Sequence, residues 1–494
     1  MGEKTLNGAF AVKGEVAVVG GGIAGVLAAR LLTLLGYQVT LFERSNRLGG
    51  CAGSFVKEGI TFNIAATTIG GLFPGFPVEK VFSLLQICPQ QKVSLSIHNP
   101  TFWIKKGKKE ALLTPFPEGL AEALATFGNL KSYQAEALIR DTQLILTSLY
   151  REPFFHLNGF RSKLKTLIYV TPIILKYGNF YKGSALKYLT ERLSSELHPD
   201  LMRLLNALVM ITAQANLQEI NAFTLHLALG YPLTGVGSVP EGNEELFYYL
   251  AEGFDYYLNS PVNSIRRSKD GKFYLLQVDK EEMSFERVVF TAPILDHGEF
   301  FQEKEIKDYI LNYKDLVSPY SAITAYGIIR DFEQKAPHCL LLTENTLGGF
   351  TSGNYFLSFL PLPWEKKTYS FTLSTHTPLA HWQKIPYKDQ AYFKLKDTLV
   401  RGLISLLSEN LELGVNQLEL KALATPHTFN YYLGRKSLGG IPVTRRNTLW
   451  KIPGNLTPFK GLYLLSDQSL FYQGWVGISL GLLNLFNWWR DAGL

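Results

Sequence analysis

The sequence is poor in cysteine and in charge, and both shortages limit what the protein can be. It contains three cysteines among 494 residues. These cysteines are irregularly spaced and form neither a disulfide framework nor a paired-cysteine metal site, so we expect a reducing compartment and no metal. Charged residues make up 18% of the chain, and the net charge of +7 is spread too thinly to indicate a nucleic-acid partner. The hydrophobic fraction of 46% excludes a disordered chain.

Uninterrupted hydrophobic runs are also scarce. Residues 16–36 are interrupted by glycines and by Arg30, which argues against a signal anchor. Residues 469–489 carry no charge and are long enough to span a bilayer, but they contain Gln473 and several glycines. A buried helix explains this second stretch equally well, and we favour it.

Familiar catalytic motifs are missing as well. The sequence shows no serine–histidine–aspartate order, no HExxH zinc motif and no paired carboxylates, so it names no catalytic residue. A cofactor is therefore expected to carry most of the chemistry.

The first chemical signature is a strand–turn–helix–strand unit near the start of the chain. Residues 16–19 are mostly β-branched, residues 23–35 have a helical pattern and residues 38–42 are again apolar. The connecting Gly20-Gly21-Gly22-Ile23-Ala24-Gly25 fits the G-x-G-x-x-G pattern of dinucleotide-binding folds. Glu43 follows the second strand, where a carboxylate accepts hydrogen bonds from ribose hydroxyls. Together these features predict a Rossmann-type domain that binds an ADP group.

Each glycine of the motif has a physical task. Gly20 allows the tight turn, Gly22 lets the backbone approach a pyrophosphate and Gly25 lets the helix pack closely on the strand. The helix start at Ile23 and Ala24 presents free N–H groups and the positive end of the helix dipole to the phosphates.

The segment Arg47-Leu48-Gly49-Gly50 favours FAD over a nicotinamide cofactor. It follows Glu43 closely, and it can bring a second loop of N–H groups and a cation to the same pyrophosphate. A plain dehydrogenase does not need this second loop. No other G-x-G-x-x-G follows a strand, because Gly235-Val236-Gly237 runs into Pro240 instead of a helix. We therefore predict FAD as the cofactor and no separate NAD(P)H domain.

The sequence also resembles a known family. Residues 43–68, with Gly49-Gly50-Cys51-Ala52-Gly53-Ser54-Phe55, are similar to the carotenoid desaturase and isomerase family of flavoproteins. That family includes phytoene desaturases, carotenoid 3′,4′-desaturases, carotenoid isomerases and retinol saturases. The similarity returns in the same order at residues 235–246, 424–440 and 461–477. The resemblance implies an FAD-dependent enzyme that desaturates or isomerises a carotenoid or a similar polyene.

The resemblance assigns roles that spacing alone does not give. It implies Glu43 and Arg44 at the ribose and adenine side, and Val262 against the adenine through its backbone. It also implies Asp467 at the ribityl or pyrophosphate region and the Trp475-Val476 backbone at the pyrimidine edge. Spacing alone leaves open a simple helix cap at Asp467. The predicted FAD-binding residues are Gly20, Gly22, Ile23, Ala24, Gly25, Glu43, Arg44, Arg47, Gly49, Gly50, Val262, Asp467, Trp475 and Val476.

Four positions depart from the family pattern. Asn63 and Ala65 stand where the family has an aspartate and a glycine, and Phe471 and Tyr472 replace the usual Pro-Gly. Because these positions surround the flavin and the substrate end, we expect FAD binding to persist and the substrate to differ from phytoene.

Two domains are expected to alternate along the chain. The first is an α/β FAD-binding domain of the glutathione-reductase-like or amine-oxidase-like type, and the second is a discontinuous α+β substrate domain. Residues 188–212 have the pattern of one long amphipathic stretch. The FAD-binding domain is expected to comprise residues 1–85, 236–300 and 421–494. The substrate domain is expected to comprise residues 86–235, which are mostly helical, and residues 301–420, which form an antiparallel sheet.

Two partners are expected, an apolar isoprenoid or polyene substrate and a membrane surface. Between Arg161 and Lys176 the chain places apolar residues among basic ones, a composition suited to the headgroup region of a bilayer. A buried connection between helices explains the segment equally well. We expect a cytoplasmic protein that associates peripherally with membranes. The alternatives are an amine-oxidase-like flavoprotein acting on a small amine, and a non-enzymatic prenyl-binding escort protein on the same fold.

Overall fold

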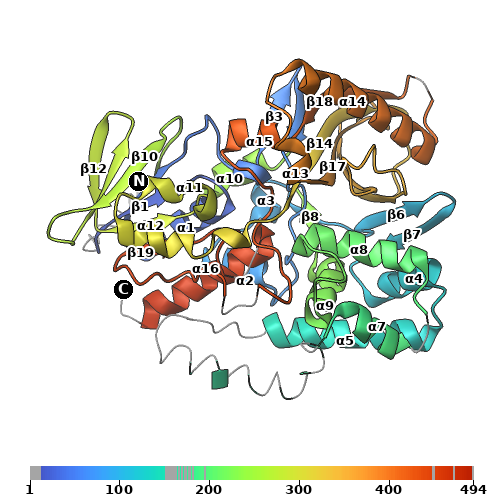
Figure 1. Ribbon diagram of the computed structural model, residues 1–494, viewed down its shortest axis with the longest axis horizontal. Helices are drawn as coiled ribbons and strands as arrows, with labels where there is room; N and C mark the ends of the chain where they lie inside the picture. Colours follow the sequence, from blue (N-terminus) through green and yellow to red (C-terminus); the bar gives the residue numbers. More distant parts are fainter. Residues whose placement is uncertain are drawn as a thin grey trace, which may run out of the picture.

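A computed structural model describes residues 13–150, 183–193, 196–414, 416–447, 451–470 and 473–491, together with single residues between 164 and 180. Figure 1 shows two parts side by side, one built around strand β1 and helix α1, the other around strands β14 and β17 and helix α8. The chain passes between the two parts several times.

The first part contains a five-stranded parallel sheet in the order β19-β13-β1-β2-β9. Its strands come from three distant segments of the sequence. Strand β1 lies in the middle and pairs with β2 on one side and β13 on the other. The strands are β1 (Glu15–Val19), β2 (Gln38–Phe42), β9 (Asp255–Tyr257), β13 (Arg287–Phe290) and β19 (Leu462–Leu464).

Both faces of this sheet are covered, as expected for parallel strands. Val16 and Val18 pack with the helices on one face, whereas Ala17 and Val19 pack with a small antiparallel sheet on the other. This alternation makes β1 apolar on both sides. The covering elements are α1 (Ile23–Leu34), α2 (Pro77–Leu84), α10 (Glu244–Leu250), α16 (Gly474–Asp491), β10 (Val262–Arg267), β11 (Tyr274–Val278), β12 (Glu281–Phe285), α11 (Ile294–His297) and α12 (Lys304–Leu311).

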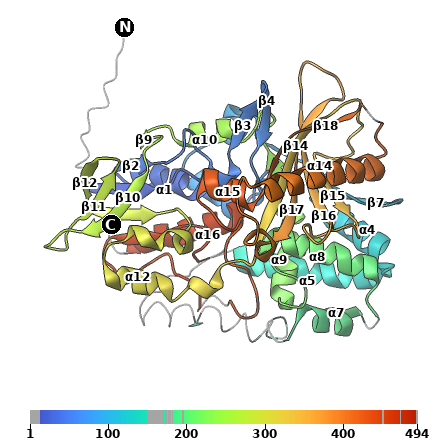
Figure 2. The same ribbon diagram turned by 45° about the horizontal axis from the view of Figure 1, so that its top comes forward.

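The second part contains a seven-stranded sheet in the order β18-β14-β17-β16-β15-β6-β7. All its neighbouring strands are antiparallel except β15 and β6. Helix α14 (Gln390–Leu411) packs on one face, and Figure 2 shows it on the side of the sheet opposite α8 and α9. The strands are β6 (Phe102–Lys106), β7 (Lys109–Leu113), β14 (Tyr320–Ile329), β15 (His338–Leu342), β16 (Asn354–Pro361), β17 (Tyr369–Pro378) and β18 (Leu418–Ala424).

The other face of the seven-stranded sheet is turned toward a group of helices. Residues 188–212, predicted as one stretch, are divided between two helices, so this prediction is wrong. Pro199 stands in the first turn of the second helix, where it needs no N–H partner, and His198 caps that helix by accepting from the Asp200 N–H at 3.2 Å. The helices are α4 (Pro117–Gly128), α5 (Ser132–Tyr150), α7 (Ala185–Leu193), α8 (Pro199–Ala213) and α9 (Ala222–Gly230).

Smaller elements join the two parts. Strand β18 continues to Ala424 and therefore crosses the expected domain boundary at residue 421. The described helices include none that is long and apolar enough to cross a membrane. The remaining elements include β3 (Ser54–Lys57), β4 (Ile60–Asn63), α3 (Pro89–Lys92), β5 (Ser96–Ile97), β8 (Gly237–Ser238), α13 (Leu379–Trp382) and α15 (Pro426–Leu433).

Candidate functional site

A cavity of about 860 Å³ lies where the two parts meet. The loop between β1 and α1 lines one end, and side chains of α5, α8 and α9 line another. Ligand sites commonly lie outside the carboxyl ends of parallel strands and at domain interfaces, and this cavity satisfies both conditions. The predicted cofactor residues all line it except Gly25 and Arg47.

The glycines of the first loop leave room for a group outside the protein. A Cβ atom added to Gly22 would meet nothing within 4 Å, whereas one added to Gly25 would lie 1.8 Å from the Gly20 carbonyl oxygen. Gly20 has a φ of +108°, which favours glycine. No side chain caps the start of α1 at Gly22, so its first N–H groups face the cavity unpaired with a side chain. This arrangement fits a bound diphosphate.

Glu43 is held rigidly at the end of β2. Its Oε2 atom accepts from the Gly21 N–H at 2.6 Å, and its Oε1 atom accepts from the backbone N–H and hydroxyl of Ser45 at 2.8 and 2.7 Å. The side chain is 8% exposed and lines the cavity. These bonds fix the carboxylate where ribose hydroxyls can donate to its remaining lone pairs.

The two predicted arginines take different positions. Arg44 lines the cavity and donates to the backbone oxygen of Tyr431 at 3.2 Å. Arg47 instead donates to the Ser54 backbone oxygen at 2.9 Å and is not among the lining residues. In this structure Arg47 therefore stabilises the Gly49-Gly50 loop and does not face the space beside Gly22.

Asp467 forms a buried ion pair that the sequence did not reveal. Its Oδ2 atom accepts from Nη2 of Arg435 at 2.6 Å, and the two side chains are 15% and 10% exposed. Arg435 also donates to the backbone oxygens of Gly439 and Ser437 and to the sulfur of Cys51. Burial lowers the pKa of the guanidinium, but Asp467 and Cys51 outweigh it, so the pKa lies above its ordinary value. Arg435 is therefore charged.

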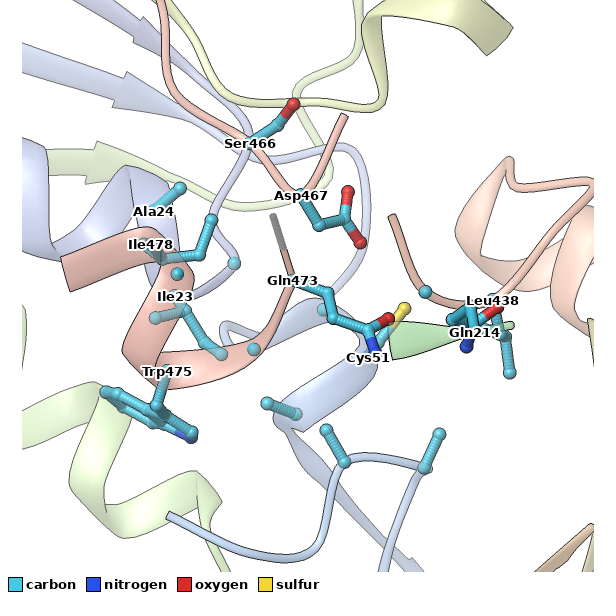
Figure 3. A pocket seen from close by; sticks show the side chains of 18 of the residues that line it. Ile23, Ala24, Cys51, Gln214, Leu438, Ser466, Asp467, Gln473, Trp475 and Ile478 are labelled. Atoms are coloured by element: carbon cyan, nitrogen blue, oxygen red, sulfur yellow. The ribbon is translucent and has the colours of Figure 1, made fainter. Parts of the chain in front are cut away.

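Figure 3 shows Asp467, Gln473 and Cys51 projecting into the same part of the cavity. Gln473 accepts from the Gly440 N–H at 3.2 Å and donates to the Ile211 backbone oxygen at 3.1 Å. Burial raises the pKa of the Cys51 thiol, against the opposing charge of Arg435. The thiol is consequently protonated at neutral pH and is a poor nucleophile.

Trp475 and Val476 occupy the first turn of α16 and line the cavity, as does Val262 at the start of β10. The Trp475 ring stacks on Phe247 with centroids 5.7 Å apart. Its Nε1 atom is buried and has no hydrogen-bond partner in the described part of the chain. An unpaired buried donor beside the glycine loop fits a ligand that carries acceptor atoms, as FAD does.

The structure describes two of the four positions that depart from the family pattern. Asn63 Oδ1 accepts from the Ser54 hydroxyl at 2.7 Å and from the Asn243 N–H at 3.0 Å, so it joins β3, β4 and α10. Ala65 lines the cavity. Phe471 and Tyr472 lie outside the described residues.

The end of the cavity away from the glycine loop is mostly apolar. Sequence reasoning could not assign these residues, because they come from helices and strands that are distant in the chain. The lining side chains there include Ile145, Leu149, Tyr150, Ala207, Met210, Ile211, Leu227, Tyr231, Leu340 and Phe356.

Comparison with known proteins finds enzymes of carotenoid metabolism among the relatives. A prolycopene isomerase from Daucus carota is 22% identical over 97% of this chain and 80% of its own length. A 4,4′-diapophytoene desaturase from Staphylococcus aureus is 38% identical, but over only 11% of each chain. The predicted resemblance to carotenoid desaturases and isomerases is thereby confirmed.

Solved structures share the fold. An oxidoreductase from Methanosarcina mazei has a TM-score of 0.62 and 16% identity, covering 96% of this chain and 100% of its own. A putrescine oxidase variant has a TM-score of 0.58 and 11% identity, covering 97% and 98%. The predicted Rossmann-type fold class is confirmed. The sequence model of the flavin containing amine oxidoreductases matches residues 23–295, which supports FAD as the cofactor. The chain belongs to this family of FAD-dependent oxidoreductases.

Proposed function

We propose that the protein desaturates or isomerises a carotenoid or a related apolar polyene. The observation that carries this proposal is the continuity of one cavity from the glycine loop to apolar walls on α5, α8 and α9. Transfer of a long apolar substrate from water to such walls would favour binding by about 25 cal/mol for each Å² of apolar surface buried. The resemblance to prolycopene isomerase and diapophytoene desaturase supports the same substrate class.

The residues of the chain would bind the cofactor, orient the polyene and exclude water from the cavity. Gly22 and the start of α1 would hold the diphosphate of FAD, and Glu43 would hold the ribose. The ion pair of Asp467 with Arg435 would lie beside the ribityl chain. Apolar side chains such as Leu149 and Leu227 would keep the polyene dry. Bound FAD supplies the acceptance or return of a hydride.

Oxidation of a small amine is less well supported. A free carboxylate is the side chain that pairs most directly with a protonated amine. Among the described lining residues the acids are Glu43 and Asp467. Glu43 is engaged with Gly21 and Ser45, and Asp467 is paired with Arg435. Neither carboxylate is available to a cationic substrate at the apolar end of the cavity.

A peripheral membrane contact is part of the proposal, because a polyene dissolves in lipid. Most of residues 161–176 lie outside the described part of the chain. Of those described, Leu164, Leu167, Ile168 and Leu175 are between 45% and 80% exposed. The double substitution of Leu167 and Ile168 by serine should release the protein from anionic liposomes in a sedimentation assay. The equally exposed Leu311→Ser, on α12, should stay bound, and equal binding by both variants would contradict this docking surface.

Anaerobic spectroscopy of the holoenzyme tests the reaction. If the reaction is desaturation, the polyene substrate should transfer a hydride to the oxidised flavin and bleach it, and oxygen or a quinone should restore the absorbance. Isomerisation should cause no net bleaching and should require prior reduction by another donor. NADH and NADPH should reduce the flavin slowly, since no nicotinamide domain is expected. Rapid reduction by a primary amine, without response to any polyene, would refute the proposal, and purification without flavin would favour the escort alternative.

A further inference from the structure

The floor of the cavity is one face of the seven-stranded sheet. Six side chains of this face line the cavity: Ala322, Leu340, Asn354, Phe356, Ser374 and His376. They come from four strands, β14, β15, β16 and β17. The floor is therefore not uniformly apolar, since polar residues of β16 and β17 interrupt it.

Asn354 and His376 stand near the adjoining ends of two paired strands on this floor. Phe356 of β16 pairs with Ser374 of β17 in an antiparallel register. Phe356 and Ser374 are the last pair of this ladder, and continuing its register by two residues would place Asn354 opposite His376 on the same face. Side chains in such positions have Cβ atoms about 5 Å apart.

Neither side chain is satisfied within the protein. The side-chain oxygen of Asn354 is buried and has no hydrogen-bond partner in the described part of the chain. The His376 imidazole makes no hydrogen bond to a described residue either, whereas His98, which follows β5, and His338, on β15, are both bonded to serine hydroxyls. Buried polar atoms are nearly always paired, so the unpaired Asn354 oxygen, together with a half-buried histidine that lines the same cavity, points to a ligand.

The pair is suited to a neutral ligand. Burial alone lowers the pKa of His376 to about 4, so the ring is uncharged at neutral pH, with one nitrogen donating and the other accepting. Asn354 offers an amide that can also donate and accept. A carboxylate would require a cation that this part of the floor does not offer, whereas a hydroxyl or a carbonyl oxygen matches the pair.

We propose that Asn354 and His376 bind a neutral oxygen substituent, a hydroxyl or a carbonyl, on the polyene. This inference rests on the proposed function and narrows its substrate class to oxygenated polyenes. A pure hydrocarbon would cover both polar groups without bonding to either. Ala322, which pairs with His376, packs in one apolar cluster with Cys51 and Ala65 of the cofactor side. The oxygen atom would thus be held near the cofactor and would determine which bond of the chain is presented there.

The test compares three ligands that share one carbon skeleton. β-Carotene has no oxygen, β-cryptoxanthin carries one hydroxyl and echinenone one carbonyl. Dissociation constants are measured on the holoenzyme in detergent by quenching of tryptophan fluorescence. The oxygenated ligands should bind the wild type about fivefold to tenfold more tightly, the range expected for one or two neutral hydrogen bonds. Asn354→Leu and His376→Phe should each reduce this preference to within twofold, and Leu340→Met on the same floor should keep it.

Two measurements of folding and one further variant test whether the lost preference reflects lost hydrogen bonds. Flavin content and the thermal melt show whether each variant is folded, and His376→Gln, which keeps a donor and an acceptor, should retain most of the preference. Equal binding of all three ligands by the wild type, or a preference that survives in both Asn354→Leu and His376→Phe, would overturn this inference alone. If none of the polyenes binds, the proposed function fails together with it.

Discussion

Substitution of Arg435 by methionine should strongly destabilise the protein, and the structure gives the size of the effect. The pair between Arg435 and Asp467 is 2.6 Å long, and both side chains are at least 85% buried. Removing one partner of a buried pair leaves an uncompensated charge and costs about 3–5 kcal/mol. The guanidinium also satisfies the carbonyl oxygens of Gly439 and Ser437, which would lose a partner. At about 2 °C for each kcal/mol, the melting temperature should fall by roughly 6–10 °C.

The companion variants separate charge from packing. Adding Asp467→Asn to Arg435→Met removes the stranded charge and should restore part of the lost stability. Arg266→Met is the matched control, because Arg266 and Glu282 form a pair at 2.8 Å with both side chains more than 40% exposed. Loss of that surface pair should cost less than about 1 kcal/mol. The reasoning is refuted if differential scanning fluorimetry gives equal shifts for the two single variants, or if the double variant melts below Arg435→Met.

Three other expectations follow from the same contacts. Glu43→Ala should lower FAD affinity by about tenfold to a hundredfold, the effect of losing a charge-assisted hydrogen bond of about 1.5–3 kcal/mol, and unchanged affinity on reconstitution of the apoprotein would contradict the assignment. Iodoacetamide should label the exposed Cys88 first and Cys51 slowly, with the buried Cys339 protected until unfolding; mass spectrometry of the labelled peptides would expose a different order. Because the folded pKa of His376 is about 4 and that of an unfolded histidine about 6.5, the unfolded state binds more protons between these values. Stability should therefore fall as the pH drops through this window, and His376→Phe should flatten the dependence in urea titrations; parallel curves would exclude this cause.

The nucleotide half of the site could be predicted because its chemistry is local. Strand β1, the glycine loop, helix α1 and Glu43 follow one another within thirty residues. The G-x-G-x-x-G spacing constrains backbone geometry directly, and the hydrogen bond between Glu43 and Gly21 closes the unit. The predicted length of this unit, its parallel pairing and its connection all follow from short-range rules.

The remainder of the site depends on contacts between distant segments. Arg435 meets Asp467 across 32 positions of the sequence, and the approach of Asn354 to His376 depends on the register of two strands. No periodicity in one sequence specifies that register. Arg47 was expected at the pyrophosphate from its nearness to Glu43, but the carbonyl of Ser54 competes for its side chain. Pro199 indicates a boundary between α7 and α8, but the continuous amphipathic pattern on both sides of it led to the prediction of one stretch.

The order of strands in the parallel sheet has a consequence for biosynthesis. β1 and β2 emerge first, whereas β13, which pairs with β1, comes from residues 287–290, and β19, which pairs with β13, comes from residues 462–464. Helix α16, which covers the same sheet and carries Trp475, is made later still. At a translation rate of about 5–20 residues per second, the first strands wait roughly 20–80 s for the last one. A complete cofactor site therefore requires the synthesis of α16, and one edge of β13 stays unpaired until β19 is made.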